Sequence, residues 1–189
     1  MTTKTKVLVA EDEAIIRLDL KEMLEEEGFE VVGEAADGDA AVRLAEERSP
    51  DLVIMDIKMP GMDGLTAAER ITSAGRSAVL ILTAFSQKDL VQRAAEAGAM
   101  GYLVKPFQKT DLMPAIDIAL ARHAEFQAVR AEAGELGDQL ATRKAVERAK
   151  GKLMDVDGIT ENEAFRVIQK RAMDQRRSMK EVAEEILAG

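Results

Sequence analysis

Residues 51–64 read DLVIMDIKMPGMDG, and this stretch decides the fold. The unbroken apolar run from Leu52 to Met55 is typical of a strand that is buried on both faces of a parallel sheet. The run ends in Asp56, a carboxylate that a packed strand has no reason to supply. The glycines that follow predict a turn and the start of a new element. The stretch therefore predicts a buried strand whose carboxyl end presents Asp56.

Apolar runs of the same kind recur along the first 105 residues, with amphipathic helical stretches between them. Together with 51–56 they lie at 6–10, 29–35, 78–84 and 100–105. Alternation of strands and helices is the pattern of βα units around a parallel sheet. We therefore expect an open α/β sheet of five strands with helices on both faces.

The length and composition are those of a folded protein with room for one domain and a smaller second one. The chain has 189 residues, of which 47% are hydrophobic and 32% are charged, far from the composition of disordered tails. It has no cysteine, which excludes disulfides and thiolate metal sites and fits a reducing cytoplasm. The amino terminus has only four consecutive apolar residues, too few for export or a membrane span. We expect a cytoplasmic protein with no membrane partner.

The charge is unevenly distributed along the chain. The net charge is −9, but residues 142–180 carry 11 Lys and Arg against 6 Asp and Glu, giving +5. Residues 1–122 carry 14 against 22, giving −8. Only the last third of the chain could therefore attract phosphate groups.

Polar residues follow four of the five expected strands. Ligands of open parallel sheets collect at the carboxyl ends of the strands, and the strand order 2-1-3-4-5 brings these positions together. The residues concerned are Glu11 and Asp12, Asp56, Thr83, and Lys105. Each alone is ordinary, since Asp often caps a helix and Thr favours strands. The whole set, in order, indicates a site.

Three carboxylates in one place repel one another, and a divalent cation with oxygen ligands relieves this. Mg²⁺ suits such a site because it also bridges to phosphoryl oxygens. An aspartate that accepts a phosphoryl group needs such a metal and a further cation. Lys105 could supply the cation, and the Thr83 hydroxyl could donate to a phosphoryl oxygen.

These residues carry a resemblance. Residues 4–122 resemble the receiver domain of two-component response regulators in VLVAEDE, DLVIMDIKMPGMDG, LILTA and GYLVKPF. The resemblance implies a flavodoxin-like, doubly wound sheet and phosphoryl transfer from a sensor histidine kinase to Asp56. It also implies Mg²⁺ held by Asp12, Asp56 and the backbone carbonyl of Lys58, with Glu11 acting mainly through water.

Further residues match the switch of that family. Thr83 and Tyr102 match the pair whose hydroxyl and ring move on phosphorylation, and Lys105–Pro106 matches a cis peptide. Such a domain is a switch and not a turnover enzyme. A phosphohydrolase of the haloacid dehalogenase type would need a second acid two residues after Asp56, where this chain has Lys58.

From about residue 111 the pattern is helical, without a strand-like run. Apolar or small side chains step by threes and fours at Ile116, Ala119, His123, Phe126, Val129, Ala133, Leu136 and Leu140. This stripe favours a dimerising coiled coil over residues 123–140. The alternative is a final receiver helix that runs into a solvated connector, because Gly134 and Gly137 each weaken a helix by roughly 1 kcal/mol.

Two capping signals divide the last part of the chain. Thr160 with Glu163, and Ser178 with Glu181, each form the S/T-x-x-E capping box. They predict helices that begin after Thr160 and after Ser178. The carboxyl-terminal part is therefore three helices with two short loops.

Residues 148–154 read RAKGKLM and place Gly151 inside a helix, at a cost of roughly 1 kcal/mol against alanine. Either another helix crosses closely over Gly151, or a ligand backbone approaches it between basic side chains. The residues alone favour helix packing.

The wider pattern resembles the ANTAR domain of transcription antitermination regulators over residues 136–187. The resemblance lies in the AKG-x-LM core and the A-F spacing at Ala164 and Phe165. It implies a three-helix bundle that binds paired hairpins in nascent RNA, typically as a dimer.

The bundle has an expected core and an expected outer surface. The core is Leu153, Ala164, Phe165, Ile168, Ala172, Val182, Ala183 and Ile186. With Phe165 in the core, base stacking would fall to arginine planes. The expected RNA-binding residues, basic except for the glycine, are Arg143, Lys144, Arg148, Lys150, Gly151, Lys152, Lys170, Arg171 and Arg176, and Arg177 is also expected outside.

The sequence thus predicts a response regulator that is phosphorylated on Asp56, dimerises, and binds RNA hairpins. A DNA-binding output, a protein-only output and a standalone phosphatase are the alternatives.

Overall fold

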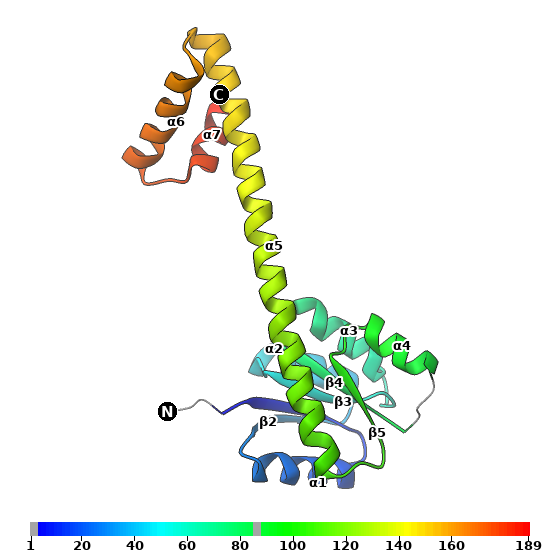
Figure 1. Cartoon of the computed structure of the whole chain (residues 1–189). Coiled ribbons are helices and arrows are strands. Elements are labelled where there is room, and N and C mark those ends of the chain that lie inside the picture. The colour runs from blue at the N-terminus through cyan, green and yellow to red at the C-terminus, as the bar shows by residue number, and fades with distance from the viewer. Residues whose placement is uncertain (1–3, 85–87) are drawn as a thin grey trace. The chain divides into compact units, whose positions relative to one another are not determined.

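A computed structural model describes residues 4–84 and 88–189 of the chain (Figure 1). The chain forms two compact units, residues 1–127 and 128–189. In the described residues, no helix combines the length and the apolar character that a membrane span needs.

The first unit contains a five-stranded, all-parallel sheet in the order β2-β1-β3-β4-β5. The strands are β1 (Lys6–Ala10), β2 (Glu30–Ala35), β3 (Leu52–Asp56), β4 (Ala78–Thr83) and β5 (Gly101–Val104). The predicted fold class and strand order are confirmed. The central strands β1, β3 and β4 are buried almost throughout, as their unbroken apolar runs require.

Helices cover both faces of the sheet. They are α1 (Ala14–Glu26), α2 (Gly38–Arg48), α3 (Gly64–Ala74), α4 (Lys88–Glu96) and the first part of α5 (Lys109–Asp157). Successive strand side chains point to opposite faces. Val7, Val9 and Ile54 therefore pack with α1 and α5, whereas Leu8 and Val53 pack with α2, α3 and α4.

A close approach of backbone fixes the loop after β3. A β-carbon on Gly64 would lie 1.9 Å from the carbonyl oxygen of Asp56, so only glycine fits there. Next to it, the Asp63 side chain caps α3 by accepting from the N–H groups of Leu65 and Thr66. Burial raises the pKa of Asp63, but these hydrogen bonds outweigh burial and hold it below the usual value. The start of α3 is thereby anchored against the strand that ends in Asp56.

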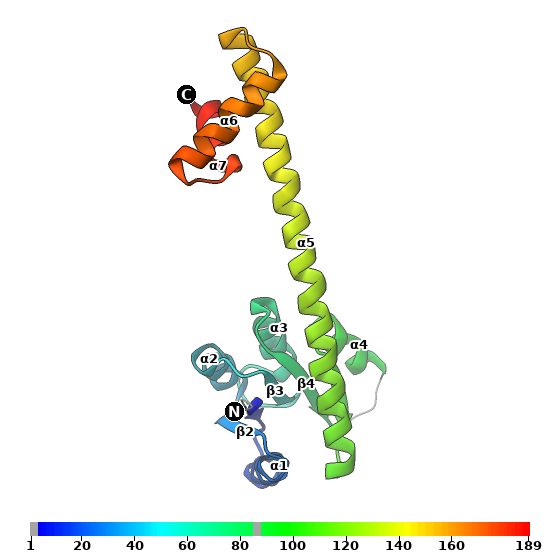
Figure 2. The same cartoon turned by 60° about the vertical axis from the view of Figure 1, so that its left-hand side comes forward.

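The second unit is a bundle of the carboxyl-terminal part of α5, α6 (Glu161–Gln175) and α7 (Met179–Ala188) (Figure 2). Both predicted capping boxes are present, at Thr160 with Glu163 and at Ser178 with Glu181. The buried core consists of Val146, Ala149, Leu153, Ala164, Ile168, Ala172, Val182, Ala183 and Ile186. The predicted three-helix bundle is confirmed.

Three expectations for this bundle are wrong. Phe165 is 41% exposed and is not part of the core, because the inward face of α6 is formed by Ala164, Ile168 and Ala172. Lys150 does not remain outside, since it follows Ala149 on the buried side of α5 and is only 7% exposed. No helix crosses over Gly151, because a β-carbon there would meet no described atom within 4 Å.

The apolar stripe of α5 divides into buried and exposed parts. Ile116 and Ala119 belong to the core of the first unit. Further along, large apolar side chains are between 51% and 65% exposed, at Phe126, Val129, Leu136 and Leu140. Gly134 and Gly137 do not interrupt the helix.

Candidate functional site

A pocket of about 210 Å³ lies at the carboxyl ends of β1, β3, β4 and β5. Of the residues predicted from the strand ends, it brings together Asp12, Asp56, Lys58, Thr83 and Lys105. Glu13, Ile57, Ala84 and Leu90 complete the lining.

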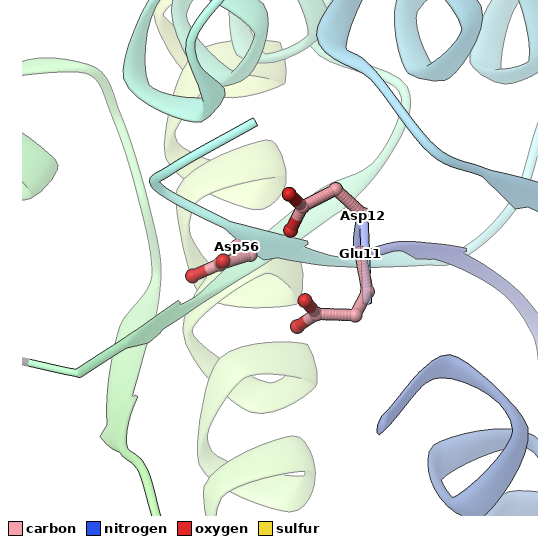
Figure 3. Close-up of side chains that lie close together, drawn as sticks. All are labelled: Glu11, Asp12 and Asp56. Carbon is pink, nitrogen blue, oxygen red and sulfur yellow. The ribbon is translucent and has the colours of Figure 1, made fainter. Parts of the chain in front are cut away.

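Three carboxylates from two strand ends converge at this pocket (Figure 3). Glu11 and Asp12 follow β1 and Asp56 ends β3. One oxygen from each lies within 4.8 Å of the other two. Glu11 is fully buried and Asp56 is 7% exposed, whereas Asp12 is exposed. The cluster therefore combines two sequestered negative charges with one that faces solvent.

Lys105 holds the two buried carboxylates. Its Nζ lies 2.5 Å from Oε2 of Glu11 and 3.1 Å from Oδ2 of Asp56. Burial raises the pKa of Glu11 and the Asp56 charge adds to this, although the Lys105 hydrogen bond opposes both. Burial lowers the pKa of Lys105, but the hydrogen bond to Glu11 and the charge of Asp56 outweigh it, so this pKa is raised. Lys105 therefore stays charged and partly neutralises the cluster.

The Asp56 carboxylate is fixed on both oxygens. Oδ1 accepts from the backbone N–H of Ile57 at 2.8 Å, and Oδ2 faces Lys105. Thr83, at the end of β4, is 3% exposed and lines the same pocket. A carboxylate and a hydroxyl thus line the same small cavity.

Tyr102 lies apart from this cluster. It is on β5, is 46% exposed, and is not among the residues that line the pocket. The chain between β5 and α5 is tied to β4 because the Lys105 N–H donates to the Thr83 carbonyl at 2.7 Å. The Lys105–Pro106 peptide is cis, as the receiver resemblance implies.

Sequence reasoning did not single out two residues beside the cluster. The Arg17 guanidinium donates to the backbone carbonyl of Glu11 at 2.6 Å and pairs with Glu34 at 3.6 Å. The Glu13 N–H donates to Oε1 of Glu11 at 3.2 Å. The only sequence signal for Glu13 was its place next to Glu11 and Asp12, and Arg17 gave none because it lies within α1.

The donor set fits a hard divalent cation. Carboxylate oxygens at this spacing, open to solvent at Asp12, are the ligands that Mg²⁺ takes while it keeps several waters. Lys58 lines the pocket as well. The residues present could therefore hold Mg²⁺ at the mouth of the pocket.

The basic residues of the carboxyl-terminal unit have different environments. Arg143, Lys144 and Arg148 on α5, and Lys170, Arg171 and Arg176 at or near the end of α6, are exposed. Lys152 is partly buried, with its Nζ 3.5 Å from the carbonyl oxygen of Leu187. Arg177 pairs with Glu185. The buried Lys150 pairs with Glu147 at 2.8 Å and Glu161 at 2.6 Å.

Gly151 lies on the outward side of α5. At 100° per residue, Lys144, Arg148 and Gly151 fall on the side opposite the core residues Val146 and Leu153. The space above Gly151 is open. We call the surface formed by Lys144, Arg148 and Gly151 the outer basic strip. On it, two basic side chains flank a position where no side chain covers the helix backbone.

Comparison with known proteins gives two domain families. Residues 7–117 match the response regulator receiver domain, and residues 134–187 match the ANTAR domain. The transcriptional regulatory protein PdtaR of Mycobacterium tuberculosis is 58% identical over 182 residues, which cover 96% of this chain and 89% of PdtaR. The chemotaxis protein CheY of Bacillus subtilis is 43% identical over 116 residues, 61% of this chain and 97% of CheY.

Solved structures resemble the first unit. The receiver domain of NarL from Mycobacterium tuberculosis has a TM-score of 0.60 and 33% identity, covering 62% of this chain and 97% of that one. CheY of Borrelia burgdorferi, from a CheX–CheY–BeF3–Mg complex, has a TM-score of 0.57 and 29% identity, covering 59% of this chain and 85% of that one. The chain belongs to the response regulators, with an amino-terminal receiver domain and a carboxyl-terminal ANTAR domain.

Proposed function

We propose that the protein is a phosphorylation-controlled RNA-binding regulator. Residues 4–122 form the phosphoacceptor domain, residues 123–140 the helical connector, and residues 136–187 the RNA-binding domain. The observation that carries the receiver half is the cluster of Glu11, Asp12 and Asp56 with Lys105 between its buried members.

The reaction transfers one phosphoryl group from a phosphohistidine of a sensor kinase to Asp56. A carboxylate oxygen of Asp56 attacks phosphorus, a P–O bond forms, the P–N bond breaks, and the histidine nitrogen keeps the electron pair. Bound Mg²⁺ would neutralise charge on the transferring oxygens. Asp12, Asp56 and the Lys58 carbonyl would hold it, with Glu11 acting through water. The presence of Mg in the related CheY complex supports this choice of metal.

Lys105 and Thr83 respond to the new charge. The Lys105 ammonium group, which lies 3.1 Å from Asp56, can pair with a phosphoryl oxygen without leaving the pocket. The Thr83 hydroxyl can donate to another oxygen. Tyr102, now 46% exposed, then turns inward as the surface around β4 and β5 repacks. The result is a population shift and not catalytic turnover.

The carboxyl-terminal unit supplies an RNA-binding output. Residues 142–180 of this unit carry a net charge of +5, which the acidic residues of 128–141 and 181–189 offset over the whole unit. The exposed basic side chains on α5 and α6 suit a phosphate backbone. The outer basic strip lets that backbone approach α5 at Gly151. RNA hairpins in transcript leaders are the expected ligands, because ANTAR regulators act in antitermination.

Phosphorylation would control this output through dimerisation. Val129, Leu136 and Leu140 expose apolar side chains at spacings of seven and four residues along one side of α5, which is the spacing of a pairing seam. A second copy of the same helix would cover them. Two bundles of one dimer could then bind two hairpins.

The test is ligand selection from mixed pools of RNA hairpins and duplex DNA, with and without acetyl phosphate and Mg²⁺. We expect the wild-type mass to rise by one phosphoryl group and RNA hairpins to be enriched in that state. Asp56→Asn is the control, with neither the mass change nor the added enrichment. Enrichment of duplex DNA, or of nothing, would refute the RNA output, whereas an unchanged wild-type mass would refute the phosphoacceptor.

A further inference from the structure

A groove of about 450 Å³ runs along α5 in the carboxyl-terminal unit, beside the starts of α6 and α7. Its lining consists of Asp138, Gln139, Thr142, Arg143, Val146, Glu147, Phe165 and Met179. This volume lies within the range of sites that take small ligands. The groove shares no lining residue with the receiver pocket.

Phe165 gives the groove its character. It is the only aromatic residue after Phe126, and 41% of its surface is exposed. It follows the fully buried Ala164 on α6, so its ring lies at the edge of the core. Val146 and Met179 add apolar surface to the same groove. The groove thus exposes an aromatic ring that is not packed into the core of the bundle.

The charged side chains of the groove differ in whether they form ion pairs. Asp138 lies 3.7 Å from the Lys180 ammonium group, and Glu147 lies 2.8 Å from that of Lys150. Arg143 is exposed and has no hydrogen bond or ion pair with any residue in the described part of the chain. Each acid thus has a lysine partner, although Glu147 shares Lys150 with Glu161, and Arg143 is the cation of the groove whose guanidinium group is available to a ligand.

We propose that this groove takes one unpaired base of an RNA loop, stacked on Phe165, with Arg143 on the adjoining phosphate. This rests on the proposed RNA output and names the place where a base is held. Unpaired loop bases are recognised by stacking on aromatic rings and by guanidinium groups. A protein partner is less well matched, because the groove offers only three apolar side chains and interface cores need more.

The experiment uses the full chain, treated with acetyl phosphate and Mg²⁺, and a hairpin selected by the wild type from a pool with a randomised loop. Phe165→Leu removes the ring but keeps an apolar side chain, and Phe165→Tyr keeps the ring. We expect Phe165→Leu to weaken binding by at least about fivefold, the loss of one base–aromatic stack. Phe165→Tyr should bind within about twofold of wild type, because the stacked face is retained.

Salt dependence separates stacking from charge. Phe165→Leu should leave the slope of log affinity against log salt unchanged, whereas Arg143→Ala should reduce it by about 0.7, the loss of one single-strand phosphate contact. Circular dichroism verifies that each variant is folded, and sedimentation gives its oligomeric state.

Different results overturn different claims. Equal affinity of Phe165→Leu and wild type refutes the stacking site alone. If Phe165→Leu loses both RNA binding and the dimer, the groove is a protein interface, and this result also refutes the stacking site. If the wild type captures no hairpin, the RNA output itself fails, and the groove proposal fails with it.

Discussion

Replacing Gly151 by alanine should stabilise the protein and weaken its binding to RNA. The position is helical, and an added β-carbon would meet no described atom within 4 Å. Alanine in a helix interior is favoured over glycine by about 1 kcal/mol. For a unit of this size, residues 128–189, that gain corresponds to a rise in Tm of about 4 to 8 °C. The folded protein therefore has no use for glycine here.

The expected loss is in ligand binding. If a phosphate backbone lies over Gly151 between Lys144 and Arg148, the added methyl group separates it from both charges. We expect the affinity for a selected RNA hairpin to fall by about tenfold, or about 1.4 kcal/mol. Thermal unfolding by circular dichroism and hairpin titration by fluorescence anisotropy measure the two effects on the same sample.

Gly137→Ala is the matched control. Gly137 also lies in α5 with no described atom within 4 Å of its β-carbon position, but it is outside the basic segment. It should raise Tm by a similar amount and leave RNA affinity unchanged. Gly151→Ala with wild-type affinity would refute the close approach. A lower Tm for Gly151→Ala would contradict the open space above Gly151.

Three further perturbations test the receiver, the caps and the seam. Lys105→Ala leaves the buried Glu11 without its partner and should lower the free energy of unfolding by about 3 kcal/mol in a denaturant titration, and Mg²⁺ should restore part of this loss. Lys109→Ala breaks only exposed ion pairs and should cost less than about 1 kcal/mol in the same titration. Backbone hydrogen bonds from Thr160 and Ser178 lower the pKa of Glu163 and Glu181, so the caps stabilise the bundle fully above pH 4.5 and this stability is lost as pH falls through the lowered values. Unfolding of the Glu163→Gln/Glu181→Gln variant should therefore depend less on acid than that of wild type, and equal slopes would contradict the assignment. Leu140→Lys should abolish phosphorylation-dependent dimers in sedimentation while Asp56 still gains its phosphoryl mass, with Ala131→Lys on the opposite side of α5 as control.

The sheet and the receiver site could be read from the sequence because local pattern and long-range position coincide there. An unbroken apolar run such as Leu52–Met55, bounded by turn signals, is typical of a buried strand, and parallel topology then places the carboxyl ends of the strands at one edge. The proximity of Asp12, Asp56 and Lys105 can therefore be predicted without knowledge of any side-chain contact. The ion pair between Lys105 and Glu11 could not be predicted, because the choice among neighbouring carboxylates depends on rotamers.

The bundle was harder to read because small helices bury narrow faces. Phe165 and Ala164 are adjacent, and apolar spacing alone does not say which one faces inward. The packing of α6 places Ala164 inside and leaves the larger ring exposed. Lys150 shows the converse, since its charge is acceptable near the core because its ammonium group pairs with the carboxylates of Glu147 and Glu161. Both outcomes follow from contacts between helices and not from periodicity.

The proposed control through dimerisation would explain how a charge on Asp56 changes RNA binding without refolding the bundle. One bundle offers a single basic segment, residues 142–180, with a net charge of +5, and one exposed ring at Phe165, which favours modest affinity. Joining two bundles makes the second binding event intramolecular and can raise overall affinity by about 10² to 10⁴ without any new contact. On this mechanism α5 is the element through which the charge acts, because it contributes Ile116 to the receiver core and Val146 to the bundle core. Amide exchange within the bundle core should then be the same before and after phosphorylation, and a phosphorylation-dependent change in the protection of Ile168 or Val182 would show that the bundle itself is remodelled.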